Sequence, residues 1–134
     1  MHDLLQSKMT PEIIKNMIII GAGSFMGGAA RYLISVAMKG MSKGFPWGTL
    51  LVNLVGCLLI GLLWGIFSKS SHANNAWVLF LTVGVCGGFT TFSTFSKEAL
   101  TMLQCNNYLG FASYVGVSII AGVSLTALGY ILAR

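Results

Sequence analysis

Ten residues in the second half of the chain, Gly87 to Ser96, hold five hydroxyl side chains and three phenylalanines in the order GGFTTFSTFS. Hydroxyl groups donate hydrogen bonds without carrying charge, so a cluster of them suits an anion. Aromatic rings add weakly positive C–H edges. The stretch therefore predicts a donor-rich site or path for an anion. For any single hydroxyl, a hydrogen bond to the carbonyl of the preceding helical turn is the alternative.

The three phenylalanines and the two glycines of this stretch predict different features. Phe89, Phe92 and Phe95 recur every third residue, which places them along roughly one face if the segment is helical. Contact with lipid or with other helices is the alternative for these rings. Paired glycines followed by threonine weaken a helix, so a break is also expected. A break frees backbone carbonyls inside the membrane, and a bound cation is one way to satisfy them.

The composition is typical of a membrane protein. Of the 134 residues, 55% are hydrophobic and 8% are charged, with a mean hydropathy of +0.81. A soluble domain carries about 25% charged residues. The net charge of +5 comes from eight lysines and arginines spread along the chain. Such residues flank membrane segments, so we expect a lipid bilayer around the chain and no nucleic-acid partner.

Four apolar segments are long enough to cross a bilayer, which takes about 20 residues of helix. They predict an all-α membrane protein with helices at 17–38, 49–67, 77–103 and 108–133, the third broken near its middle. Residues 17–134 form the transmembrane domain. Residues 1–16 form a polar extension, for which an interfacial helix and a disordered segment both remain open. Close helix packing is predicted by glycines spaced four apart: Gly23 and Gly27, Gly61 and Gly65, Gly84 and Gly88.

The basic residues show almost no bias between the two sides of the membrane. One side would hold Lys8, Lys15, Lys69 and Arg134. The other would hold Lys39 and Lys43, with Arg31 and Lys97 closer to the membrane. Because lysine and arginine in short loops set the orientation, such a chain could insert both ways. Two opposite copies could then pair about an axis in the membrane plane, which is a dual-topology homodimer.

The chain lacks the residue patterns of an enzyme. Cys57, Cys86 and Cys105 form no CxxC pair, and His2 and His72 lie outside the apolar segments. No nucleophile with a neighbouring base and no metal-ligating set is visible. We expect the cysteines to behave as small buried hydrophobic residues.

Polar residues within the apolar segments are mostly hydrogen-bond donors. Besides the hydroxyl cluster, they are Arg31, Asn53, Tyr114, Ser118, Ser124 and Thr126. Glu98, near the end of the third segment, is the only carboxylate within them. Proton-coupled transporters and cation pathways usually use embedded carboxylates, so this inventory favours an anion.

At these residues the sequence resembles the Fluc (CrcB) family of fluoride channels. The resemblance covers nearly the whole chain and rests on GGAARY, GTLLVNLVGCLLIG and GGFTTFSTFSKEA in the first three segments. It implies an antiparallel homodimer with two pores and a structural sodium ion at the dimer interface. It also implies passive, selective export of fluoride across a bacterial inner membrane, which lowers fluoride toxicity.

The resemblance further implies roles for individual residues. Phe92 and Phe95 match the pore phenylalanines, and Asn53 matches the pore asparagine. Gly87 and Thr90 match the positions whose backbone carbonyls hold sodium.

The remaining implied roles belong to polar side chains. A polar track is implied at Thr91, Ser93, Thr94, Tyr114 and Ser118. Arg31 matches a basic residue near an aqueous vestibule, where it would raise the local anion concentration. Gly122 stands where some relatives carry serine, so the track could be shorter at that end.

Two other functions remain as alternatives. A small dual-topology multidrug exporter, or another anion transporter, would share the four short helices and the weak charge bias. Proton coupling in such an exporter would need a carboxylate near the centre of a span. A non-transporting tetraspan protein would explain the glycine pairs but not the donor cluster.

Overall fold

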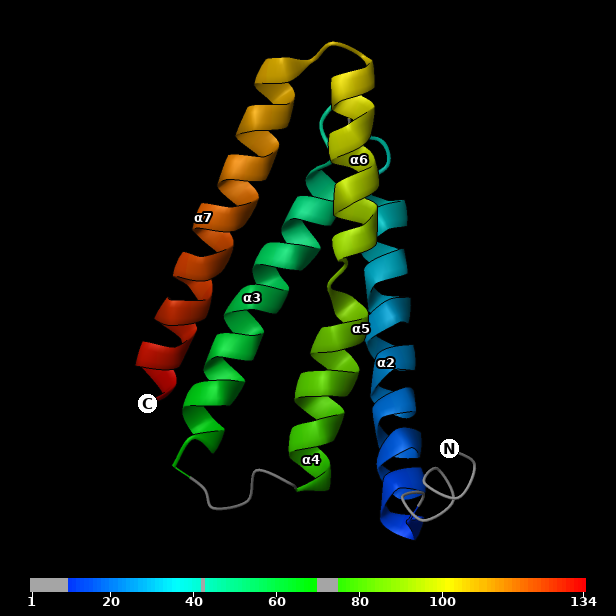
Figure 1. Cartoon of the computed structure of the whole chain (residues 1–134), viewed down its shortest axis with the longest axis vertical. Helices are drawn as coiled ribbons and strands as arrows, with labels where there is room; N and C mark the ends of the chain where they lie inside the picture. Colours follow the sequence, from blue (N-terminus) through cyan, green and yellow to red (C-terminus); the bar gives the residue numbers. More distant parts are fainter. Residues whose placement is uncertain (1–9, 42, 70–74) are drawn as a thin grey trace, which may run out of the picture.

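The computed structural model describes residues 10–41, 43–69 and 75–134, which form helices and connecting turns without any strand. The helices are α2 (Pro11–Ala37), α3 (Trp47–Phe67), α4 (Ala76–Val78), the π-helix η1 (Leu79–Cys86), α5 (Gly87–Phe89), α6 (Phe92–Gln104) and α7 (Tyr108–Ala133). α4, η1, α5 and α6 follow one another as a single bent span (Figure 1). In length and apolar composition, four spans of the described chain are able to cross a membrane.

The helices pack as two pairs. α3 lies along α7, and α2 lies along η1 and α5 (Figure 1). α6 contacts α7 at the end of the bundle where the two are joined by a short turn. The prediction of an all-α membrane protein with four spans is confirmed.

Glycines allow the helix backbones within each pair to touch. A Cβ atom added to Gly88 would lie 2.8 Å from the Cα of Ser24 and 3.0 Å from its carbonyl carbon. A Cβ added to Gly129 would lie 2.8 Å from the backbone nitrogen of Leu62. Real atoms do not approach so closely, so these positions accept only glycine without a shift of the backbone. The predicted glycine contacts join α2 to the third span and α3 to α7.

The first helix begins at Pro11 rather than at Met17. Proline suits the first turn of a helix because the missing N–H has no intrahelical partner there, and Glu12 favours the same end. Residues 11–16, which were expected to belong to the polar extension, therefore form the first turns of the same helix as the apolar segment. The rest of the predicted extension, residues 1–9, lies outside the described residues.

The predicted break in the third helix is confirmed. Thr90 and Thr91 both have extended backbones, with φ and ψ of −83° and 158° and of −149° and 117°. The predicted common face of the three phenylalanines is wrong, because the break separates Phe89 from Phe92. Phe89 is buried, whereas Phe92 is 79% exposed.

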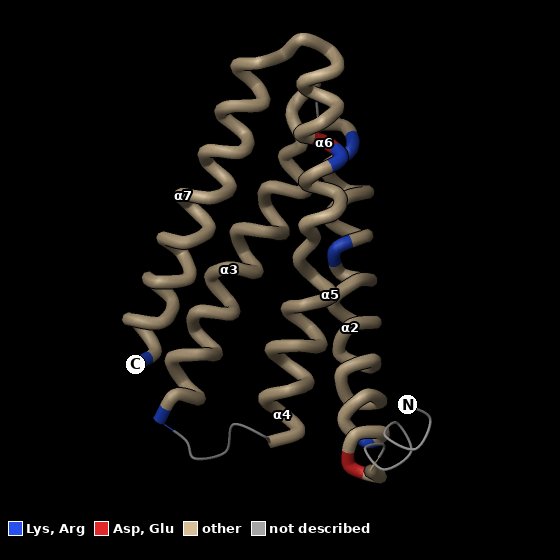
Figure 2. Tube along the Cα trace, viewed as in Figure 1, with Lys and Arg blue, Asp and Glu red and all other residues tan. Residues whose placement is uncertain are grey.

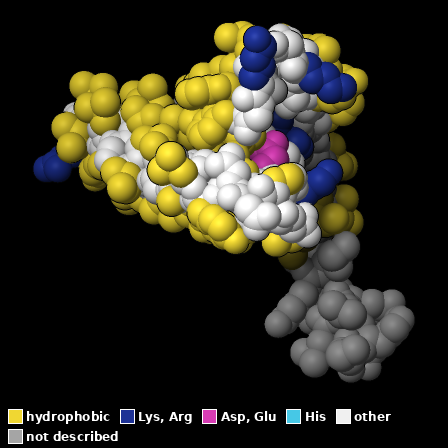
Figure 3. Space-filling model, turned by 90° about the horizontal axis from the view of Figure 1, so that it is seen from above, with side chains coloured by type: hydrophobic (Ala, Val, Ile, Leu, Met, Phe, Trp, Pro, Cys, Tyr) yellow, Lys and Arg dark blue, Asp and Glu magenta, His cyan; other side chains and the backbone are white. Residues whose placement is uncertain are grey.

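The outer surface of the bundle is mainly apolar. Large side chains such as Phe25, Leu109 and Ile120 are at least 70% exposed, which suits contact with lipid. Figure 3 shows one end of the bundle, where basic side chains lie at the rim and an acidic side chain is recessed between the helices. One cluster of buried apolar side chains is formed by four residues: Leu50, Ala99, Met102 and Tyr114.

Candidate functional site at the helix break

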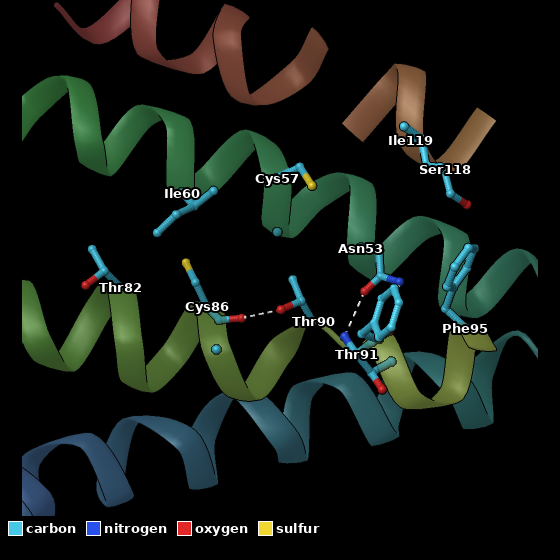
Figure 4. Close-up of a pocket in the computed structure, with 13 residues that line it drawn as sticks. Asn53, Cys57, Ile60, Thr82, Cys86, Thr90, Thr91, Phe95, Ser118 and Ile119 are labelled. Atoms are coloured by element: carbon cyan, nitrogen blue, oxygen red, sulfur yellow. Dashed lines mark hydrogen bonds between the residues drawn. The ribbon is translucent and has the colours of Figure 1, made fainter. Parts of the chain in front are cut away.

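An open groove of about 430 Å³ runs along the break, between the third span, α3 and α7 (Figure 4). Seven of the predicted site residues line it: Asn53, Gly87, Thr90, Thr91, Phe92, Phe95 and Ser118. These residues come from three separate helical spans, so the fold brings them together. The prediction of a donor-lined break in a membrane helix matches this groove.

The side chain of Asn53 binds both backbone groups, the N–H and the carbonyl, of Thr91 at the break. Its Oδ1 accepts a hydrogen bond from the N–H of Thr91 at 2.8 Å, and its Nδ2 donates to the carbonyl of Thr91 at 3.1 Å. Figure 4 shows the amide at the wall of the groove. Because an amide nitrogen carries two hydrogens, one N–H of Asn53 remains for another acceptor.

The break leaves backbone carbonyls without their usual helical donors. In an unbroken helix the N–H of Thr91 would bond to the carbonyl of Gly87, but here it bonds to Asn53. Within the described part of the chain, no hydrogen-bond donor reaches the carbonyls of Gly87 or Thr90. Gly87 is exposed and Thr90 is half-buried. Unwound carbonyls of this kind are typical sodium ligands in membrane transporters, so the two carbonyls fit that ion.

Three hydroxyl groups cluster at the first turn of α6. The Oγ1 of Thr91 accepts a hydrogen bond from the N–H of Thr94 at 3.2 Å and caps the helix. The same hydroxyl donates to the Oγ1 of Thr94 at 3.1 Å and lies 3.4 Å from the Oγ of Ser93. Only Thr91 of the three lines the groove, while Ser93 and Thr94 lie beside it.

The other two hydroxyls of the stretch bond within their own helix. Thr90 donates to the carbonyl of Cys86 at 3.0 Å, and Ser96 donates to the carbonyl of Phe92 at 2.9 Å. The alternative of bonding to the preceding turn therefore holds for these two. It fails for Ser118, whose buried Oγ has no hydrogen-bond partner among the described residues.

The two phenylalanines that line the groove differ in how their rings pack against other side chains. The ring centroids of Phe92 and Phe95 are 5.7 Å apart, and Phe95 lies 5.1 Å from the ring of Tyr114. Phe92 is open on its other side. Phe95 is thus held by α7, whereas Phe92 is free to meet lipid, an ion or a second protein chain.

Glu98 was assigned no role from the sequence, and it forms a polar cluster beside the groove. Its two carboxylate oxygens accept hydrogen bonds from Thr49 at 2.8 Å and from Tyr114 at 2.7 Å. Tyr114 is fully buried and Thr49 is 7% exposed. The signal in the sequence was helical spacing, because Thr91, Phe95 and Glu98 fall on one face of α6. Tyr114 is therefore bound to Glu98 and does not line the groove.

The cysteines only partly follow the prediction. Cys86 is buried and Cys57 is half-buried, and both line the groove. Cys105 is exposed at the end of α6, so for this residue the prediction is wrong. Gly122 lies beside Cys57, whose Sγ would be 3.4 Å from an added Cβ. Gly122 thus faces the thiol of Cys57.

Arg31 is separated from the groove. It lies on α2 and its Nε donates a hydrogen bond to the carbonyl of Gly88 at 3.1 Å. The side chain is half-buried. The structure thus places it on the opposite side of the broken helix from Asn53.

Comparison with known proteins identifies the family. The family model described as "CrcB-like protein, Camphor Resistance (CrcB)" matches residues 18–130, which include most or all of each of the four spans. The chain belongs to the CrcB family. A CrcB relative from Clostridium novyi is 44% identical over 119 residues, which cover 85% of this chain and 93% of the relative. Another, from Phocaeicola vulgatus, is 41% identical over 117 residues, covering 87% and 96%. Both relatives bear the name "Fluoride-specific ion channel FluC".

Family membership places the groove in a multi-pass membrane protein. The four apolar spans of the CrcB chain agree with that location. A relative from Desulfotalea psychrophila, 38% identical over 90% of the chain and 94% of its own length, carries the same fluoride-channel name.

Proposed function

We propose that this CrcB chain is a passive fluoride channel of a bacterial inner membrane, not an enzyme. Its relatives are named for fluoride conduction, and the groove supplies the chemistry that a small anion needs. The observation that carries the proposal is a set of unused donors at the groove. Ser118 has a buried hydroxyl without a partner in the described structure, and Asn53 has a spare amide hydrogen.

The same groove contains no carboxylate among its lining residues, which favours an anion over a cation. The first backbone N–H groups of α6, at Phe92 and Ser93, have no acceptor within the described chain. They add positive potential at the start of a 13-residue helix. An anion beside Thr91 would therefore meet backbone and side-chain donors together.

Fluoride selectivity would follow from size and hydration. A narrow path must replace the tightly held water of fluoride with close donors, and a larger halide would fit the same donors poorly. The edges of Phe92 and Phe95 would supply weakly positive C–H groups between the polar positions. No coupling to another ion is required, so the anion would move down its gradient and leave the cytoplasm when fluoride accumulates there.

We propose that two copies pair in opposite orientations to complete the path. The groove is open on one side, and Phe92 is largely exposed there. Away from Arg31, Figure 2 shows basic residues toward both ends of the bundle. Three belong to one end by their elements: Lys15 near the start of α2, Lys69 after α3 and Arg134 after α7. Three belong to the other: Lys39 after α2, Lys43 before α3 and Lys97 on α6. Equal charge at both ends removes the usual bias toward one orientation. The pair would contain two pores.

Sodium would bind at the centre of this pair. The carbonyls of Gly87 and Thr90 lack donors in the described chain, and two copies would bring four such oxygens together. The bound ion would satisfy these carbonyls and hold the two broken helices in place. Its charge would also favour an anion nearby.

Fluoride efflux from liposomes that contain the purified protein tests the proposal. Fluoride release faster than chloride release supports it, and equal or absent release would contradict it.

A further inference from the structure

Arg31 supplies a hydrogen bond that the helix break removes. Its Nε donates to the carbonyl of Gly88 at 3.1 Å. In an unbroken helix this carbonyl would accept from the N–H of Phe92, which lies beyond the break. A carbonyl without a donor at membrane depth costs several kcal/mol in principle, so the partner matters.

The close approach of α2 places Arg31 at this carbonyl. Ser24 and Gly27 lie seven and four residues before Arg31, so all three share one face of α2. A Cβ on Gly88 would lie 2.8 Å from the Cα of Ser24, and one on Gly27 would lie 2.8 Å from the nitrogen of Phe89. This face of α2 therefore contacts the backbone of the third span directly, and Arg31 continues the contact up to the break.

Two side chains thus hold the break from opposite sides. Asn53 of α3 binds Thr91, and Arg31 of α2 binds Gly88. Between them lies Thr90, and beside Gly88 lies Gly87. No donor in the described chain reaches the carbonyls of these two residues or that of Phe89. The guanidinium holds the peptide group between Gly88 and Phe89, which adjoins the peptide group that carries the carbonyl of Gly87.

We infer that Arg31 is a positioning residue. Its Nε–H bond to Gly88 holds the break in the third helix, at which the carbonyls of Gly87 and Thr90 have no donors in the described chain. Its contribution to anion flux comes from this bond rather than from attraction of anions at the channel mouth. The inference rests on the proposed channel function for its flux readout, although the bond itself does not.

Three substitutions separate the bond from the charge. Arg31→Gln removes the charge but keeps a donor, because its Nε2 lies the same number of bonds from the backbone as the arginine Nε. Arg31→Lys keeps the charge but has a methylene at that place. Arg31→Met removes both. Lys39→Gln is the control for loss of a basic residue, since Lys39 is exposed at the end of α2.

The experiment measures fluoride efflux from liposomes and the unfolding temperature of the purified protein for each variant. We expect fluoride efflux through Arg31→Met to be about tenfold slower than through the wild type. This ratio corresponds to the loss of one ordinary hydrogen bond. Arg31→Gln should retain more flux and a higher unfolding temperature than Arg31→Lys, and Lys39→Gln should match the wild type. The slowing should be the same at low and high ionic strength, because a direct hydrogen bond is little screened.

The opposite ranking would overturn the inference. If Arg31→Lys keeps the wild-type flux, Arg31→Gln does not, and added salt removes the difference, Arg31 acts by attracting anions. Unchanged flux and unfolding temperature in Arg31→Met would likewise overturn it. Failure of the proposed channel function can be told apart from failure of this inference. If the chain is not a fluoride channel, the wild type itself releases no fluoride, but the unfolding temperatures of the variants still test the Arg31 bond.

Discussion

The amide of Asn53 takes the place of helix hydrogen bonds at Thr91. Its oxygen accepts from the Thr91 N–H at 2.8 Å and its nitrogen donates to the Thr91 carbonyl at 3.1 Å. A single side chain on α3 therefore satisfies both backbone groups of the residue at which the third span breaks. The break persists inside the membrane because another helix supplies its missing bonds.

Replacing Asn53 tests this relationship. Asn53→Leu leaves two backbone groups of Thr91 without partners, each worth about 1–3 kcal/mol when buried. We expect a lower unfolding temperature in detergent and loss of fluoride flux. Asn53→Asp keeps the acceptor for the Thr91 N–H, so it should unfold at a higher temperature than Asn53→Leu. It should still conduct poorly, because its negative charge repels the anion. Wild-type unfolding and flux in Asn53→Leu would show that the two bonds are unimportant.

The two phenylalanines that line the groove, Phe92 and Phe95, are expected to act in different ways. Phe92 is 79% exposed and Phe95 contacts Tyr114, so Phe92→Ile should slow fluoride flux without lowering the unfolding temperature of the protomer. Phe95→Ile should lower both. We expect flux to fall by at least about tenfold in each, because the aromatic C–H edges are lost.

Phe25→Ile is the matched control for Phe92→Ile. Phe25 is 77% exposed on α2 and does not line the groove. Its substitution should leave flux unchanged. If Phe92→Ile and Phe95→Ile conduct fluoride as fast as Phe25→Ile, the rings of Phe92 and Phe95 serve only as packing.

The close contact between α2 and the third span is tested by alanine substitution of glycine. In Gly88→Ala the new methyl group would lie 2.8 Å from the Cα of Ser24, so the helices must separate. We expect destabilisation of about 1–3 kcal/mol, as for an overpacked core. Gly21→Ala on the same helix as Ser24 has nothing within 4 Å and should be neutral or stabilising by about 0.5–1 kcal/mol. Equilibrium unfolding in mixed detergent measures both, and equal stabilities would refute the contact.

The proposed sodium site is tested at Gly87. In one chain a Cβ at Gly87 meets nothing within 4 Å, so Gly87→Ala should leave the protomer stable. If four carbonyls converge on sodium between two copies, the methyl group should crowd the partner and weaken the dimer. Gly116→Ala, which is equally open, is the control. Size-exclusion chromatography with light scattering measures the dimer in sodium and in N-methylglucamine buffers.

The sodium prediction has a clear contrary result. Dimerisation and fluoride flux that are the same in both buffers, and the same in both glycine variants, would exclude a structural sodium ion between copies. A dimer that needs sodium but tolerates Gly87→Ala would place the ion elsewhere.

The four spans and the break were predictable because they follow from local chemistry. Hydrophobic length identifies a span, and GGFTT weakens a helix wherever it occurs. The start of the first helix was missed because residues 11–16 include Glu12 and Lys15, and the helix begins at Pro11, before the apolar segment. The π-helix at Leu79–Cys86 was not predicted, and it packs along α2.

The site was predictable in its residue types but not in its contacts. Asn53 was expected to donate to an anion, yet one N–H and the oxygen of its amide bond to Thr91. Arg31 was expected at a vestibule, yet it binds Gly88. Glu98 was set aside because no partner was visible nearby in sequence. Its partners, Thr49 and Tyr114, lie 49 and 16 residues away along the chain, and only the fold brings them together.

The central claim is that this CrcB chain conducts fluoride selectively, and a paired efflux measurement tests it most directly. Liposomes with purified protein are loaded with potassium fluoride or potassium chloride, valinomycin is added to carry potassium, and the released anion is followed with an ion-selective electrode. We predict rapid release of fluoride and release of chloride no faster than from protein-free liposomes. Fluoride release that equals the protein-free rate, or chloride release as fast as fluoride release, would contradict the account.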